Sequence, residues 1–285
     1  MTRAKIWTLT PLLIVLTLVI GTLTVHTQLS PSAGDDIRRQ RFVHQGDIDA
    51  EGRPELDPRG RGGAPPAEAP AAFDNHTNGH TDQATFDENR ATFEEVETIS
   101  DGLGPTYNAQ SCRECHQNVV TGGASQVTEH RTGHMENGLF FESPGGSLIQ
   151  SRSTYPEMAE RVAVQDDIRT FRISTNTLGS GFVEAISNST LLANRDQQPA
   201  AMRGTALVVS VLEANSQARI GRFGWKAQHA SLESFAADAY VNEMGVTSPL
   251  LPVENTSGGR DVSAYDPVPD PEDNGDDVKE FAEFM

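Results

Sequence analysis

The chain has 285 residues, of which 36% are hydrophobic and 6% aromatic, and its mean hydropathy is -0.43. This apolar content is low for the length, so we expect a modest core accompanied by long polar segments. The formal net charge of -18 argues against nucleic acid or an anionic membrane surface as a partner, and two cysteines are too few for a disulfide framework.

The N-terminus predicts export. Arg3 and Lys5 precede a stretch from 6 to 34 that contains no Asp, Glu, Lys or Arg and is most apolar between 11 and 21. A basic start followed by an apolar run is typical of a secretory signal, and residues 6–25 are also long enough to span a bilayer. We expect a signal peptide or, with slight preference, an uncleaved anchor that leaves the rest of the chain in the periplasm.

Composition divides the chain into four parts. Residues 1–33 are the signal or anchor, and 34–84 form a Pro/Gly-rich segment that we expect to be a disordered linker. Residues 85–253 carry nearly all of the large apolar side chains and are expected to form the folded domain. Residues 254–285 are acidic, and we expect this tail, like the linker, to be mobile and not to dock on the domain.

Within the folded part the patterns favour helices. Residues 231–245 place apolar side chains at helical spacing, with Ser231 as the predicted N-cap and Gly245 as the stop. Shorter helices are predicted at 157–165 and at 204–215, the second ambiguous with a buried strand. The sequence therefore predicts a mainly α domain with much irregular loop.

The two cysteines define the most specific motif of the chain. Cys112 and Cys115 are followed directly by His116, and Cys-x-x-Cys-His is the attachment sequence of a c-type haem. The two thiols add to the two vinyl groups of the haem, and the histidine is placed to bind the iron as the proximal ligand. We therefore expect one covalent haem c.

Two other interpretations of the motif were weighed. A zinc site needs four ligands, which His130 and His134 could complete, and a thioredoxin-like redox pair would need a βαβ context that the sequence lacks. The haem interpretation accounts for all three residues at once and agrees with an exported protein.

The surroundings of the motif resemble a known family. The segment "GLGPTYNAQSCRECH" (102–116) resembles the first haem segment of the bacterial di-haem oxidoreductases, also described as thiol oxidoreductases or di-haem peroxidases. The likeness continues at 174–186, 220–232 and 236–249. The resemblance implies a cytochrome-c-like fold, a periplasmic location, and electron-transfer or peroxidase-type chemistry with a partner cytochrome or another redox partner.

The chain departs from this family in one respect. The family carries a second Cys-x-x-Cys-His in a C-terminal domain, whereas this sequence has no third cysteine. We expect the chain to be the first-haem portion of a longer relative, truncated before a second haem domain. Its last residues, 276–285, have the spacing of the first turns of an amphipathic helix.

Function depends on the sixth iron ligand. Candidates are His130, His134 and Met135 in what we expect to be a flexible loop, and Met158 and Met244 farther on. The resemblance favours a displaceable ligand, so His134 is placed first and Met244 second. Solvated histidines and a Met packed in the core remain the plainer alternatives.

A peroxidase would also need a group that moves the peroxide proton. Glu184 stands alone among apolar residues and is the candidate acid/base, with a salt bridge to Arg172 or Arg222 as the alternative. Two functions therefore remain open. The first is an exported c-type haem protein in electron transfer, and the second is a peroxidatic haem centre that reduces hydrogen peroxide with electrons from a partner cytochrome.

Overall fold

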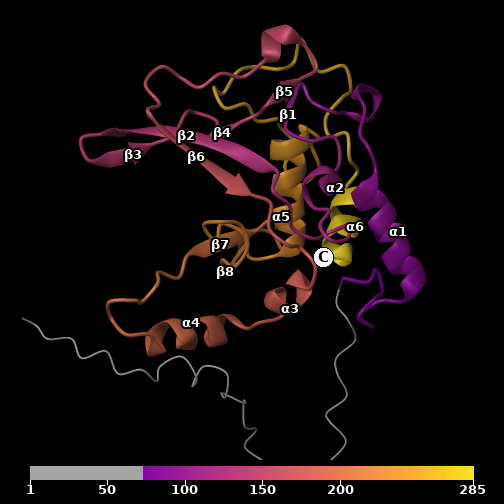
Figure 1. The fold of residues 1–285 in the computed structure, drawn as a ribbon, viewed down its shortest axis with the longest axis vertical. Coiled ribbons are helices and arrows are strands. Elements are labelled where there is room, and N and C mark those ends of the chain that lie inside the picture. The colour runs from indigo at the N-terminus through magenta and orange to yellow at the C-terminus, as the bar shows by residue number, and fades with distance from the viewer. Residues whose placement is uncertain (1–72) are drawn as a thin grey trace, which may run out of the picture. The chain divides into compact units, whose positions relative to one another are not determined.

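The computed structural model describes residues 73–285, and Figure 1 shows their fold. Helices make up 28% and strands 19% of these residues, so the fold is an α/β mixture with several small sheets. The expectation of a mainly α, cytochrome-c-like domain is therefore wrong. The predicted signal or anchor at 1–33 and most of the predicted linker at 34–84 lie outside the described residues. Between 73 and 285 no helix is both long and apolar enough to cross a membrane.

The helical elements include one short helix at the cysteine motif, which contacts the helix formed by Gln83–Glu94, and several longer helices. They are α1 (Gln83–Glu94), η2 (Ile99–Asp101), α2 (Cys112–Cys115), η3 (Pro156–Met158), α3 (Ser180–Glu184), α4 (Asn188–Gln197), α5 (Leu232–Ala239), η4 (Tyr240–Met244) and α6 (Asp276–Phe284). Helix α1 contacts both α2 and α6, and α5 contacts α6. In the view of Figure 1, α5 lies between these helices and the largest sheet.

All strand pairs among residues 73–285 are antiparallel. The largest sheet has the order β3-β2-β4, with β6 also paired to β2, and two further sheets join β1 to β5 and β7 to β8. The strands are β1 (Thr106–Tyr107), β2 (Thr128–Glu136), β3 (Leu139–Phe141), β4 (Leu148–Ile149), β5 (Arg152–Ser153), β6 (Ile168–Ile173), β7 (Val208–Val211) and β8 (Gln217–Ile220).

Strand β2 corrects the expectation of a flexible loop around His134. Glu136 pairs with Leu139 across Asn137 and Gly138, whose φ angles of 51° and 79° are those of a tight two-residue hairpin turn. The Asn-Gly pair was the sequence signal for this hairpin. Because β2 is paired along most of its length, its side chains are held by a sheet.

Helix α5 and the π-helical turn η4 confirm the helix predicted at 231–245. The Ser231 hydroxyl accepts a hydrogen bond from the Ser234 N–H, and Gly245 ends the helix with a φ of 75°. A Cβ at Gly245 would lie 2.6 Å from the carbonyl oxygen of Gly104, so the close approach of these two segments requires glycine.

The two shorter predictions fared differently. The helix expected at 157–165 is wrong, because only the 3-10 turn η3 forms there and the chain is irregular beyond it. The segment 204–215 contains strand β7, so the strand alternative is right, but only Val211 of this strand is buried.

The core lies where α1, α5, η4 and α6 meet. Helix α6 contributes Val278, Phe281 and Phe284, which are 1%, 3% and 4% exposed. The helix predicted at the end of the chain is confirmed, but the expectation that residues 254–285 do not dock is wrong. The spacing of these three apolar side chains puts them on one face, and that face covers Phe93 of α1 and Tyr240.

Candidate haem-binding site

The cysteine motif is held on a capped turn of helix. The Ser111 hydroxyl accepts from the Glu114 N–H at 3.1 Å, and the Glu114 carboxylate in turn accepts from the Gln110 N–H at 2.9 Å. This reciprocal arrangement satisfies N–H groups at the start of a short helix. An ion pair with Arg152 holds the same carboxylate, so the backbone that presents the thiols is fixed on both sides.

His116 directly follows this helix and is oriented by a distant backbone carbonyl. Its Nδ1–H donates to the Thr175 carbonyl oxygen at 2.8 Å. Because a carbonyl can only accept, this bond fixes the proton on Nδ1 and leaves the lone pair on Nε2. Burial lowers the pKa of His116, so the neutral ring is favoured. A neutral imidazole with its second nitrogen bonded to a carbonyl is the usual state of a metal-binding histidine.

Both cysteine side chains are free thiols that are partly buried, and Cys112 packs against the core. Burial, together with the nearby Glu97 carboxylate, raises the pKa of Cys112 to about 12. Burial and the neighbouring Glu243 raise the pKa of Cys115 to about 11. A reactive redox thiol has a lowered pKa, which is the opposite of what these two thiols experience. The donor set of two neutral thiols and one imidazole Nε2 fits covalent haem.

His134 lies on β2 and is held by a buried aspartate. Its Nδ1 is 2.9 Å from Asp166 Oδ1, and the Asp166 side chain is fully buried and also accepts from the hydroxyls of Thr132 and Ser143. Burial would raise the pKa of Asp166, but these hydrogen bonds outweigh it and the pKa is lowered. The ring stacks on Phe141. This arrangement fixes the tautomer of His134 and leaves Nε2 as the free nitrogen.

The other candidate ligands occupy different environments. His130 stacks on Phe171 with ring centroids 4.8 Å apart, and Met135 on the same strand is 53% exposed. Met158 and Met244 are each 3% exposed. Met244 belongs to the core cluster against which Cys112 packs, so it shares the surroundings of the motif.

Glu184 has a structural partner that the sequence did not indicate. Its carboxylate accepts from the N–H of Leu232, the first residue of α5, at 2.8 Å. The predicted contact with Arg222 is present but goes to the Glu184 backbone carbonyl, at 2.9 Å, and Arg172 lies against Glu129 instead. Glu184 therefore ties α3 to the start of α5, where a negative charge is favourable.

Sequence reasoning missed a buried polar group beside Cys112. Tyr240 is 3% exposed, and its hydroxyl donates to Glu97 Oε1 at 2.7 Å, with Asp277 Oδ2 at 3.4 Å. Burial raises the pKa of Glu97 to about 7 and that of Asp277 to about 6. A buried phenol needs a hydrogen-bond partner, so a tyrosine on the apolar face of the predicted helix was the available signal.

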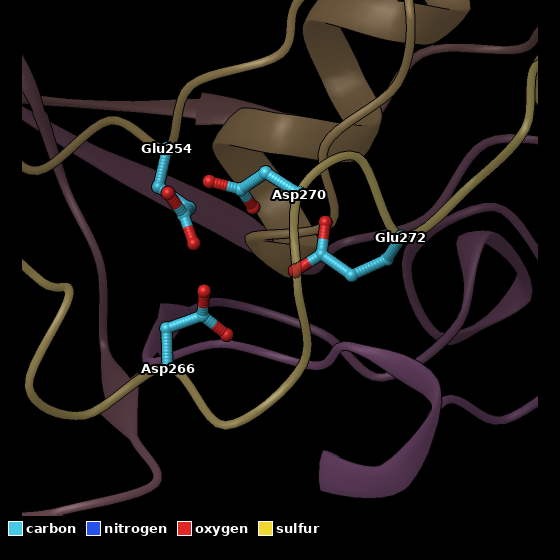
Figure 2. A group of neighbouring side chains, drawn as sticks. All are labelled: Glu254, Asp266, Asp270 and Glu272. Atoms are coloured by element: carbon cyan, nitrogen blue, oxygen red, sulfur yellow. The ribbon is translucent and has the colours of Figure 1, made fainter.

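Four acidic side chains also gather in the C-terminal loops (Figure 2). Glu254, Asp266, Asp270 and Glu272 each place one oxygen within 4.8 Å of the others. Thr247 donates its N–H to Glu272 at 2.8 Å and its hydroxyl to Asp270 at 3.1 Å, which ties the acidic loop to the end of η4. Burial and the neighbouring carboxylates raise the pKa of Glu254 to about 8.

The motif and its geometry are those expected of a haem-binding redox protein. Residues 143–283 match the family model described as "Di-haem oxidoreductase, putative peroxidase", which confirms the resemblance found in the sequence. The match supports a redox haem protein; it begins beyond the cysteine motif, and the assignment to the first-haem portion stays a prediction. Comparison with curated proteins and with solved structures gave no match.

Proposed function

We propose that this chain is an exported c-type haem protein that transfers single electrons. One haem c is attached through Cys112 and Cys115, with His116 as an iron ligand. The observation that carries this proposal is the hydrogen bond from His116 Nδ1–H to the Thr175 carbonyl oxygen. This bond leaves the lone pair of Nε2 available for iron, on the residue that directly follows Cys115. When bound, the haem supplies a centre that gains and loses one electron.

The surrounding residues have separate tasks in this proposal. The capped turn α2 presents both thiols at a fixed spacing, and the buried ring of Phe93 lies edge-on to His116 with centroids 6.2 Å apart. Packing on this side keeps the imidazole neutral and limits the positions that it can adopt.

Location and partners follow from the same proposal. The basic, apolar N-terminus is the sequence feature that supports a periplasmic protein, with anchoring to the inner membrane by an uncleaved segment. A partner cytochrome or another electron donor or acceptor would exchange electrons with the haem. The acidic net charge of -18 favours a partner with a basic docking face.

The test is a double substitution of the thiols. The Cys112→Ala/Cys115→Ala variant should be exported without covalent haem, as measured by the pyridine haemochrome spectrum and by haem staining of denaturing gels. Arg113→Ala is the matched control, because Arg113 is exposed between the two cysteines and should leave covalent haem unchanged. Unchanged haem content in the double variant would end the haem c assignment.

A peroxidatic centre is the second candidate, favoured by the family description "putative peroxidase". His134 is oriented by the buried Asp166 carboxylate, as a ligand or proton-transfer group would be, but β2 holds it about 20 Å along the strand from Thr128, which lies beside the Thr175 contact of His116. The spin-state test below therefore decides whether His134 binds the iron. Glu184 is less suited to proton transfer, because its carboxylate already accepts from the start of α5.

Spin state separates the two candidate ligands. His134→Ala should convert a low-spin ferric spectrum to high-spin and increase the rate of reaction with peroxide. Met244→Leu conserves volume, so it should cost under about 1.5 kcal/mol and leave the spectrum unchanged. Glu136→Gln, at an exposed position on the same strand, is the control. A spin change in Met244→Leu with a silent His134→Ala would instead favour a Met-ligated electron carrier.

A further inference from the structure

Tyr240 is a buried phenol with an oriented proton acceptor. Its side chain lies in the core cluster at 3% exposure, and Glu97, which accepts from its hydroxyl, is only 5% exposed. The distance of 2.7 Å between the phenol oxygen and Glu97 Oε1 is within the range at which a proton passes directly between two groups. Asp277 Oδ2, at 3.4 Å, is outside this range.

An unbroken chain of aromatic rings connects Tyr240 to His116. The ring of Tyr240 meets Phe281 edge-on with centroids 5.1 Å apart, and Phe281 meets Phe93 at 6.0 Å. Phe93 then meets His116 at 6.2 Å. These rings pack in one apolar core, against which Cys112 also lies. Tyr240 is therefore separated from the proposed iron ligand by two rings in van der Waals contact.

We propose that Tyr240 is a redox-active residue that supplies one electron to the haem site and passes its phenolic proton to Glu97. The inference rests on the proposed haem at His116 and on its oxidation by a hydroperoxide. It adds a residue that stores an oxidising equivalent inside the protein.

One electron and one proton leave Tyr240 in this step, and each has an acceptor. Tyr240 loses one electron, which reduces the oxidised haem by one equivalent, and its O–H bond breaks as a new O–H bond forms on Glu97 Oε1. The products are a neutral tyrosyl radical and a protonated Glu97. An external donor then returns one electron to Tyr240, and Glu97 returns the proton.

Because Tyr240 is buried, its phenolic proton leaves when the ring loses an electron. Burial and the nearby Glu97 carboxylate raise the pKa of Tyr240, so the phenol holds its proton in the resting protein. Once the ring is oxidised, the phenol is a strong acid and a charged product would be costly in the core. Transfer to Glu97 removes that charge.

The other tyrosines of the chain lack this combination of features. Tyr107 is partly buried and packs against the same core, which makes it the matched control. Tyr155 is 36% exposed and lies against Tyr265 with ring centroids 5.3 Å apart. Only Tyr240 joins the aromatic chain that leads to His116 through the contacts described above.

The experiment is rapid-freeze electron paramagnetic resonance of the haem-loaded full chain after addition of one equivalent of hydrogen peroxide at pH 8. The wild type and Tyr107→Phe should show a tyrosyl signal that narrows with ring-deuterated tyrosine. Tyr240→Phe should lose at least nine-tenths of that signal. Glu97→Gln retains an acceptor oxygen but takes up no proton, so it should lower the yield several-fold while the tyrosine remains.

Each sample is also checked for haem by the pyridine haemochrome spectrum and for peroxide reaction by stopped-flow absorbance. A haem that reacts with peroxide and gives no tyrosyl signal overturns the Tyr240 inference and leaves the haem assignment standing. A signal of unchanged yield in Tyr240→Phe or in Glu97→Gln also overturns it. A protein without covalent haem overturns the inference together with the proposed haem c. A haem that is inert to peroxide overturns the inference and the peroxidatic candidate, and leaves the electron-transfer function standing.

Discussion

Replacement of Phe281 by Ala tests whether the C-terminal helix is part of the core. Phe281 is 3% exposed and contacts the rings of Phe93 and Tyr240. Loss of a fully buried phenyl group removes about 1.5–3 kcal/mol of transfer free energy, and the cavity that remains brings the usual cost to about 3–5 kcal/mol. For a protein of this size we expect the melting temperature to fall by about 10 °C.

The assay is urea unfolding followed by far-UV circular dichroism, with haem content matched between samples. Phe182→Ala is the control, because Phe182 is 70% exposed on α3 and its loss should change the free energy of unfolding by no more than about 0.5 kcal/mol. Amide exchange should also show α6 protected in the wild type. A Phe281→Ala cost below about 1 kcal/mol, with unprotected α6 amides, would refute the docked helix.

Two further predictions concern carboxylates. The pKa of Glu97 is raised from 4.5 to about 7, so the folded protein holds this proton to higher pH than the unfolded chain does. The free energy of unfolding should therefore fall by up to about 3 kcal/mol between pH 4.5 and 7 and then level off. Glu97→Gln, which mimics the protonated form, should match the wild type at pH 5 and exceed its stability at pH 8; parallel stability curves would contradict this. Glu184→Ala removes the acceptor for the Leu232 N–H at the start of α5 and should cost about 1 kcal/mol by urea midpoint. Glu184→Gln keeps an acceptor oxygen and should lose less than half as much free energy of unfolding. Equal losses in the two variants would show that the hydrogen bond from Leu232 does not cause the destabilisation.

The predictions that the structure confirms are those that rest on residues within one short segment. The helix at 231–245 was predictable because its period, its Ser231 cap and its Gly245 stop all lie within one segment. The helix at 276–285 was predictable from its apolar spacing alone, because it has no side-chain cap at its start. That α6 docks was not predictable, because its short apolar face adjoins a strongly acidic loop and its partner residues lie on α1 and near η4.

Strand β2 shows the opposite case. It is stabilised by pairing with β6, so that His130 lies opposite Phe171, 41 positions away, and this register is not visible in the segment itself. The local pattern around His134 therefore predicts a loop, although the Asn-Gly turn that follows is typical of a hairpin.

The sequence by itself determined the chemistry of the candidate site, because Cys112, Cys115 and His116 are neighbours in the chain and their spacing is sufficient to identify a haem attachment motif. Tertiary structure decided which groups surround that motif. The Thr175 carbonyl lies 59 positions from His116, and Glu97 lies 143 positions from Tyr240. Such partners are chosen by the folding of separate segments into one core, and buried polar groups accept only the partners that this packing brings within hydrogen-bond distance.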